Sequence, residues 1–139
     1  MKLIANLTIM ASLFLATTAF AQEPEAVQQA QHAADRWLAL VDAGDYAQSW
    51  DQGASAFQAA VSRPAWMSAV QSARAPFGIM KARTLKVASY KKSLPGAPAG
   101  EYVVIQYSSQ FANNANAIET VTPMLDKDGT WKVSGYFIK

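Results

Sequence analysis

The spacing of the apolar residues changes once along the chain, at Gly78, and this change limits the fold more than any other feature. Before Gly78 the apolar residues recur every three or four positions, which is the period of a helix with one buried face. After Gly78 they alternate with polar residues, which is the period of a strand. Helices that all precede the strands are typical of an α+β domain. We therefore expect N-terminal helices packed on one face of a curved four-stranded antiparallel sheet.

The first expected helix covers residues 25–43, and Gly44 ends it because glycine readily takes the positive φ of a C-cap. A short second helix should begin at Asp45, with Gln48 completing a capping box. Gly53 should end it, and the residues 55–58 repeat the capping-box spacing. A third helix should begin near Pro64. Its expected buried stripe consists of Trp66, Ala69, Val70 and Ala73.

The strands expected after Gly78 cover residues 83–92, 101–111, 117–125 and 130–139. Alternation is clear in the first of them, where Leu85 and Val87 oppose Lys86 and Ala88. Short linkers join the four segments, and the last contains Gly129 in a tight turn. Pro123 cannot donate to a strand ladder, so its strand should have an edge or a bulge there. Sequential strands joined by short turns make an antiparallel sheet.

The first residues have the pattern of a signal peptide. Lys2 precedes an apolar run over residues 3–16, and Ala19-Phe20-Ala21 is the small-x-small pattern that signal peptidase accepts. We expect cleavage near Ala21, which gives a signal peptide of residues 1–21 and a single α+β domain of residues 22–139. We expect no membrane span after cleavage, and a periplasmic or secreted location.

Several kinds of site are excluded or disfavoured by the composition. The chain has no cysteine, so disulfides, thiol catalysis, thiolate metal sites and a lipoprotein anchor are excluded. His32 is the one histidine, which disfavours a metal site and a Ser-His-Asp triad, and we expect it on a partly exposed helix face. There is also no glycine-rich phosphate loop. We expect no metal and no cofactor.

Charge is unevenly distributed along the chain. Residues 22–51 contain six acids and one base, whereas residues 52–100 contain seven bases and no acid. The basic segment 63–92 could face an anionic component of the cell envelope, or an acidic helix could lie beside it and balance it. Export and a near-neutral total charge disfavour nucleic-acid binding.

Glu119 is the strongest candidate for a functional side chain, because glutamate is unfavourable in the middle of a strand. It could form a structural ion pair with Arg83 or Arg74, or face solvent. It could also be a ligand-binding or catalytic carboxylate, acting as a base with a nearby tyrosine as donor. The pair Asp42 and Asp45 straddles a helix end, so we expect cap roles for it rather than a catalytic pair.

Aromatic residues are the remaining candidates, either as core or as the lining of a site for a small apolar ligand. The candidates for ligand binding are Trp37, Tyr46, Trp50, Tyr107 and Tyr136.

The segments "WLALVDAGDYAQSW", "RPAWMSAVQSARAPFG" with Arg83 beyond it, "AIETVTPML" and "GTWKVSGYFIK" together resemble the domain of unknown function 4019 family. Its members are small, mostly bacterial and exported, and have no assigned activity. The arrangement also resembles the nuclear transport factor 2-like and cystatin-like α+β group, which includes isomerases, dehydratases and binding modules. The resemblance implies an exported envelope protein, and we expect a non-catalytic binding or accessory module. The alternatives are an isomerase or dehydratase with a pocket carboxylate at Glu119, and an interaction protein that uses segment 63–92.

Overall fold

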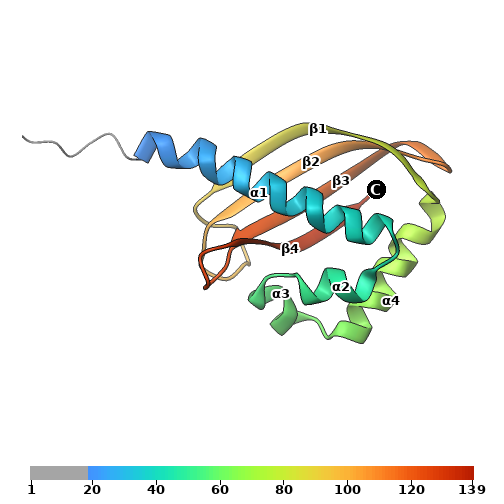
Figure 1. Cartoon of the computed structure of the whole chain (residues 1–139), viewed down its shortest axis with the longest axis horizontal. Helices are drawn as coiled ribbons and strands as arrows, with labels where there is room; N and C mark the ends of the chain where they lie inside the picture. The colour runs from blue at the N-terminus through green and yellow to red at the C-terminus, as the bar shows by residue number, and fades with distance from the viewer. Residues whose placement is uncertain (1–18) are drawn as a thin grey trace, which may run out of the picture.

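The computed structural model describes residues 19–139. Residues 1–18 of the expected signal peptide therefore lie outside the described part of the chain. The helices come first and the strands follow, as Figure 1 shows. The helices are α1 (Ala19–Asp42), α2 (Tyr46–Asp51), α3 (Ser55–Ala60) and α4 (Arg63–Arg74), followed by the 3-10 turn Ala75–Phe77. The strands are β1 (Met80–Lys91), β2 (Tyr102–Phe111), β3 (Asn114–Leu125) and β4 (Trp131–Ile138). Within residues 19–139, no helix combines the length and the hydropathy that a membrane span requires.

The strands form one antiparallel sheet in the order β1-β2-β3-β4, so the expected α+β class is confirmed. The sheet is curved, and α1 lies across it (Figure 1). β3 pairs on both sides, and its register with β4 shifts between Thr122 and Pro123. A bulge therefore accommodates Pro123, because proline has no N–H to donate to the ladder. The alternative of an edge strand at this position is wrong.

The core lies between α1 and the sheet. Trp37, Leu38 and Val41 are almost fully buried on α1, and they pack against Ile105 and Val121 of the two central strands. Burying side chains of this size contributes about 1.5–3 kcal/mol each relative to leaving them exposed. The rings of Trp37 and Trp66 are 5.7 Å apart, so the core extends from α1 to α4.

The helix starts differ from the sequence prediction. α1 begins at Ala19, before the expected start at residue 25. Gly44 has φ of 78° and ends α1 as expected. Asp45 precedes α2 but makes no side-chain capping bond, because its ψ of 61° lies outside the extended region that N-caps adopt. Ser55 is the first residue of α3 rather than its cap, and its hydroxyl donates to Asp126 instead.

The buried stripe of α4 is also different from the expected one. Ser62 caps this helix by accepting from the Ala65 N–H, and Pro64 lies in the first turn as expected. Ala69 and Ala73 are exposed, so their predicted burial is wrong. The buried residues are Trp66, Val70 and Arg74, which recur every four positions. α4 contacts the rest of the protein along this narrow line, and an arginine occupies its last position.

The alternation predicted in the first strand holds only in part. The register of β1 with β2 shifts between Leu85 and Val87, and both side chains are exposed, at 40% and 44%. The extra residue at this bulge reverses the phase of the strand, so Ala88 and Tyr90 pack against the core instead.

Candidate functional site

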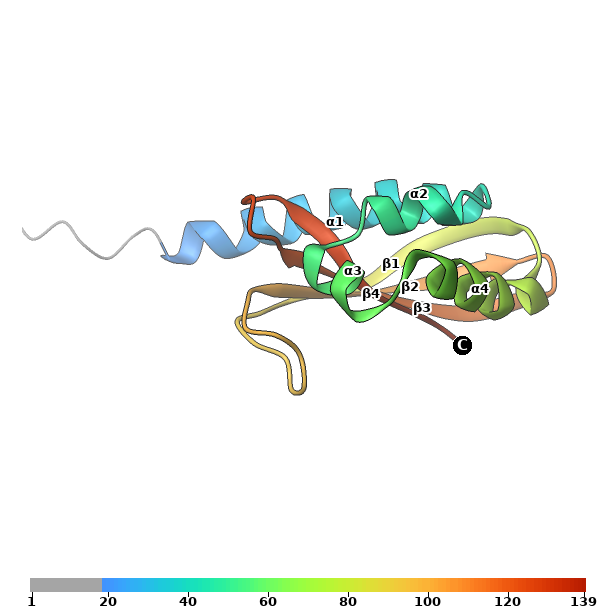
Figure 2. The same ribbon diagram turned by 90° about the horizontal axis from the view of Figure 1, so that it is seen from below.

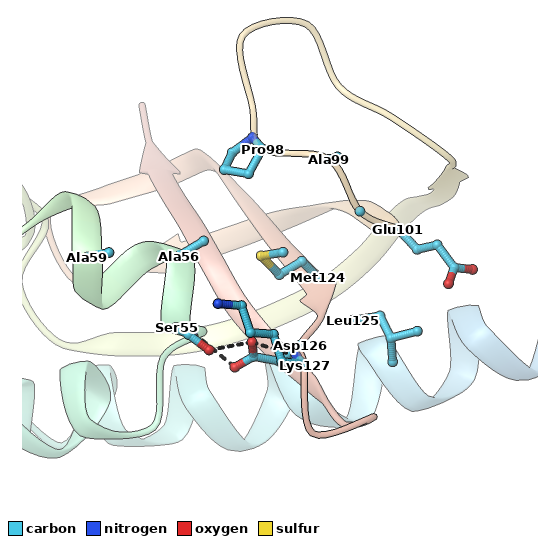
Figure 3. Close-up of a pocket in the computed structure, with 11 residues that line it drawn as sticks. Ser55, Ala56, Ala59, Pro98, Ala99, Glu101, Met124, Leu125, Asp126 and Lys127 are labelled. Carbon is cyan, nitrogen blue, oxygen red and sulfur yellow. Dashed lines mark hydrogen bonds between the residues drawn. The ribbon is translucent and has the colours of Figure 1, made fainter.

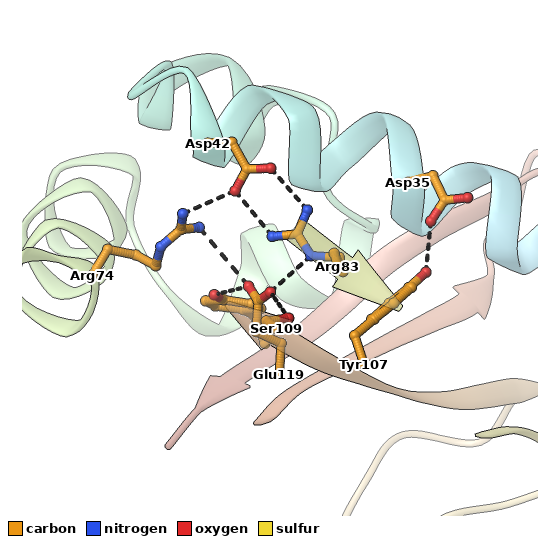
Figure 4. A network of polar contacts seen from close by, with 8 residues as sticks. Asp35, Asp42, Arg74, Arg83, Tyr107, Ser109 and Glu119 are labelled. Atoms are coloured by element: carbon orange, nitrogen blue, oxygen red, sulfur yellow. Dashed lines mark hydrogen bonds and ion pairs between the residues drawn. The ribbon is translucent and has the colours of Figure 1, made fainter. Parts of the chain in front are cut away.

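Glu119 lies at the centre of a buried polar network that joins helices to the sheet (Figure 4). Its side chain has no exposed surface. Oε1 accepts from Arg83 Nε at 2.7 Å and from Ser109 Oγ at 2.6 Å, and Oε2 accepts from the Tyr136 hydroxyl. Arg74 Nη1 is 3.9 Å from Oε2. Both carboxylate oxygens therefore have donors, and the structure brings together Glu119, Arg83 and Arg74, the three residues considered for an ion pair.

Arg83 links Glu119 to α1. Its Nη1 and Nη2 donate to the two oxygens of Asp42 at 2.8 and 3.0 Å, while Nε donates to Glu119. One planar guanidinium thus binds two carboxylates, and this fork geometry is available to arginine but not to lysine. The arginine side chain is 15% exposed, so solvent weakens these contacts only partly.

Arg74 completes the network from the end of α4. Its Nη2 donates to Asp42 Oδ1 at 2.8 Å, and its guanidinium carbon lies 4.8 Å from the centre of the Phe111 ring. The buried Nε and Nη1 make no hydrogen bond. The ring face and the nearby carboxylates of Glu119 and Asp42 offset this cost electrostatically, so the cation is stabilised more by charge than by hydrogen bonds.

The network explains the acid at the end of α1. Asp42 is the last residue of that helix, where a negative charge opposes the helix dipole. Burial disfavours the charged form of Asp42, but hydrogen bonds and charge from Arg83, and then from Arg74, outweigh it and lower the pKa of its carboxyl below 3.8. Asp42 therefore stays ionised between two cations.

Two tyrosines next to the network are held in their neutral forms. Burial, followed by the charge of Glu119, raises the pKa of the Tyr136 hydroxyl far above its usual value of 10.0. Burial and a hydrogen bond to Asp35 likewise raise the pKa of Tyr107, whose hydroxyl is 2.6 Å from Asp35 Oδ1. Both hydroxyls are donors to carboxylates, and neither is a free acid or base at neutral pH.

The candidate ligand-binding aromatics lie mostly in the core rather than around one cavity. Trp37 donates from Nε1 to the Ser49 carbonyl at 2.8 Å, and its ring is 5.4 Å from the ring of Tyr136. Trp50 donates to the Val61 carbonyl at 2.8 Å. Tyr46, Trp50 and Tyr136 pack against the core cluster that contains Trp37 and Tyr107.

An open pocket lies elsewhere, between α3 and the segment before β2 (Figure 3). Its volume is about 410 Å³, and its apolar lining includes Ala56, Pro98 and Met124. Its polar lining includes Glu101, Lys127 and Asp126, and the Asp126 carboxylate accepts from the N–H and the hydroxyl of Ser55. The volume of the pocket lies within the range of small-molecule sites. The sequence analysis did not find it, because residues far apart along the chain form it.

The basic segment 63–92 is partly used within the protein. Arg63 pairs with Asp51 on the surface at 2.9 Å, while Arg74 and Arg83 belong to the buried network. Besides Arg63, the exposed bases of the segment are Lys81, Lys86, Lys91 and Lys92. His32 is also exposed, on α1. Within residues 19–139, no three His, Cys, Asp or Glu side chains gather as a metal site would require.

Sequence reasoning missed three polar residues that take part in the buried polar contacts, of which Ser49 and Ser109 are themselves buried. Asp42 was considered only beside Asp45, and Ser109 was not considered at all. Ser49 is fully buried, and its hydroxyl accepts from Trp66 Nε1 at 2.9 Å. A signal existed for Ser109, because it follows the inward-facing Tyr107 by two positions in a strand. A polar residue in phase with an apolar stripe is a sign of a buried polar contact.

The fold and this network define a small α+β domain whose helices are connected to its sheet by buried ion pairs. A family model described as "Protein of unknown function (DUF4019)" matches residues 33–136, and the chain belongs to that family. The matched range contains Asp42, Arg74, Arg83 and Glu119. Comparisons with curated proteins and with solved structures gave no match. The wider resemblance to the nuclear transport factor 2-like group stays a prediction.

Proposed function

We propose that this protein is an exported envelope protein that acts as a binding or accessory module rather than as an enzyme. The observation that carries the proposal is the environment of Glu119, which has no exposed surface and has donors on both oxygens. A general base must come within about 2.6–3.2 Å of the proton that it removes. Glu119 instead accepts from three side chains of the other strands, with Arg74 of α4 nearby at 3.9 Å, which argues against the isomerase or dehydratase alternative.

The stability of the Glu119→Gln variant tests this proposal without a substrate. If the Glu119 carboxylate is structural, the variant should lose about 3–5 kcal/mol of unfolding free energy, because the neutral amide leaves the buried cations without a matching charge. Adding Arg83→Met to the same chain should recover part of that loss. Catalytic groups are often held at some cost to stability, so a catalytic Glu119 predicts an unchanged or raised melting temperature. That result would overturn the proposal.

The pocket beside α3 is the place where we propose that a small apolar ligand binds. Its apolar walls and its volume support this, and anilinonaphthalene sulfonate, a dye that fluoresces in apolar sites, is a suitable probe. Ala59 lines the pocket and is exposed, so Ala59→Trp should fill the space and abolish dye binding. The control Ala69→Trp places the same ring on the exposed side of α4 and should change nothing. Equal binding by both variants would contradict the assignment.

Export is the remaining part of the proposal, and it rests on the N-terminal signal pattern. Mass spectrometry of the periplasmic fraction should find a chain that begins at Gln22. Recovery of the intact chain from the inner membrane would contradict cleavage.

A further inference from the structure

The pocket beside α3 lies at the base of the loop between β1 and β2, which projects from the sheet on the side opposite α1 (Figure 2). Its apolar lining comes from three segments that are far apart in the sequence. Ala56 and Ala59 belong to α3, Pro98 belongs to the loop, and Met124 lies near the end of β3 (Figure 3). A hydrocarbon chain can therefore leave water here, but these side chains do not determine which polar group it carries.

Two carboxylates adjoin the pocket, and the first of them, Glu101, does not face it. Its carboxylate accepts from the Tyr90 hydroxyl, and Tyr90 packs against the core cluster between α1 and the sheet. Figure 3 shows the Glu101 side chain extending away from Met124 and from α3. The carboxylate of Glu101 is therefore not a binding group for a ligand in the pocket.

The second carboxylate, that of Asp126, is already bound by the protein itself. It accepts from the Ser55 N–H at 3.0 Å, from the Ser55 hydroxyl and from the Lys127 N–H at 2.8 Å, and the Lys132 ammonium lies 3.5 Å from Oδ2. Burial disfavours the charged form, but the hydrogen bonds from Ser55 and from the Lys127 N–H, and then the charge of Lys132, outweigh it and lower the pKa of the Asp126 carboxyl below 3.8. Asp126 therefore stays ionised, and its oxygens and its charge already have partners.

Lys127 is the remaining charged side chain of the lining. It is exposed, and its side chain extends from the turn after β3 toward α3 at the edge of the pocket (Figure 3). Lys132 pairs with Asp126 and Asp128, whereas the Lys127 ammonium makes no ion pair with any residue between 19 and 139. Among the described residues, the pocket thus presents one unmatched charge to a ligand, and this charge is positive.

We infer, on the basis of the ligand-binding role proposed for this pocket, that its ligand is a small apolar molecule with one carboxylate. The hydrocarbon part lies against Ala56, Ala59 and Met124, and the carboxylate pairs with the Lys127 ammonium. Each CH₂ group that enters the pocket should tighten binding about fourfold. An exposed ammonium–carboxylate pair adds at most about fivefold, so the chain supplies most of the affinity and Lys127 selects the end group.

Three ligands with the same eight-carbon chain test this inference, namely octanoate, octanol and octylammonium. Nuclear magnetic resonance titration of the isotope-labelled protein measures each dissociation constant and shows where each ligand binds. Octanoate should bind about three- to fivefold more tightly than octanol, and octylammonium should bind most weakly. All three should shift the amide signals of Ala56, Ala59 and Met124. The preference for octanoate should decrease at high salt, because Lys127 is exposed.

Lys127→Gln separates the role of the charge from that of the apolar walls. This variant should bind octanoate and octanol about equally, while its affinity for octanol should stay that of the wild type. Lys81→Gln is the matched control, because Lys81 is also exposed but lies near the start of β1, outside the pocket lining. It should keep the full preference for octanoate. Circular dichroism should show that both variants fold, because both side chains are exposed.

Failure of this inference and failure of the pocket assignment give different results. If octanol binds to the wild type as tightly as octanoate does, or if Lys127→Gln keeps the preference, the pocket binds apolar ligands but the carboxylate is not selected. If Lys81→Gln loses the preference equally, the selection comes from the total charge of the protein, and the inference is again wrong. If neither these ligands nor anilinonaphthalene sulfonate shift the signals of pocket residues, the proposed ligand site is wrong and the inference fails with it.

Discussion

Arg83 holds Asp42 through two parallel hydrogen bonds, of 2.8 and 3.0 Å, between the first strand and the end of the first helix. A second fork of the same kind lies on the surface, where Arg63 donates from Nε and Nη2 to Asp51 at 2.9 Å each. The two pairs have nearly the same geometry and differ in burial. They therefore allow the effect of burial on an ion pair to be measured within one protein.

Arg83→Lys should destabilise the protein by about 1–3 kcal/mol, because lysine cannot bind Asp42 and Glu119 at the same time and leaves buried acceptors unpaired. Urea unfolding followed by tryptophan fluorescence measures the change. Arg63→Lys is the control, and it should have a much smaller effect, because solvent screens the exposed pair. Equal losses in the two variants would show that burial of the Arg83 network does not matter.

Asp42 should make stability depend on acid pH. Its pKa is lowered in the folded protein, so its contribution is complete above the unfolded value of about 3.8 and is lost as pH falls through the folded value. Asp42→Asn should be less stable than the wild type at neutral pH, and the difference should narrow below about pH 4. Thermal melts of both proteins at several pH values measure this. A difference that is constant from neutral to acid pH would contradict the role of the ionised carboxylate.

Ser49 should contribute to stability through one hydrogen bond between α2 and α4. Ser49→Ala removes the acceptor of the Trp66 N–H in a buried site, which should cost about 1–3 kcal/mol. Ser68→Ala is the control, because Ser68 lies on the exposed side of α4 and its loss should change stability by less than about 0.5 kcal/mol. Chemical denaturation distinguishes the two, and a neutral Ser49→Ala would mean that Trp66 finds another acceptor.

Trp131 and His32 should lie at opposite ends of the range of stability effects. Trp131 is 8% exposed and belongs to the core cluster, so Trp131→Ala should cost about 3–5 kcal/mol. His32 is exposed on α1, so His32→Ala should cost less than about 1 kcal/mol. Denaturant midpoints measure both, and similar losses would contradict the burial of the Trp131 ring.

The elements of the fold were predictable because they depend on local periodicity. The class and the four strands follow from spacing, and the missing N–H of proline predicted an edge or a bulge at Pro123, of which the structure has the bulge. The phase of β1 beyond Leu85 was not predictable, because an extra residue at a bulge leaves no local signal there. Helix caps were also predicted wrongly at Asp45 and Ser55, since the capping-box spacing does not fix the backbone angles that capping needs.

For the site around Glu119, the sequence predicted only that Arg83 or Arg74 could be its ion-pair partner. A glutamate at position 119 indicated a buried contact, and basic residues at 74 and 83 were available to meet it. That Asp42 joins both arginines depends on how the end of α1 lies over the sheet, which is set by packing between distant segments. The pocket beside α3 is likewise a product of tertiary arrangement, and single residues do not indicate it.

The buried network also has a consequence for the rate at which the protein opens. Its ion pairs connect residues 32, 36 and 41 positions apart, and the two that involve Asp42 form only after the end of α1 has docked on α4 and on the sheet. Contacts that form after the folding barrier slow unfolding without speeding folding. Stopped-flow kinetics of Arg83→Lys should therefore show faster unfolding and nearly unchanged refolding. The network would then increase the kinetic stability of the protein. Slower unfolding would protect the chain from proteases, which cut molecules that have opened.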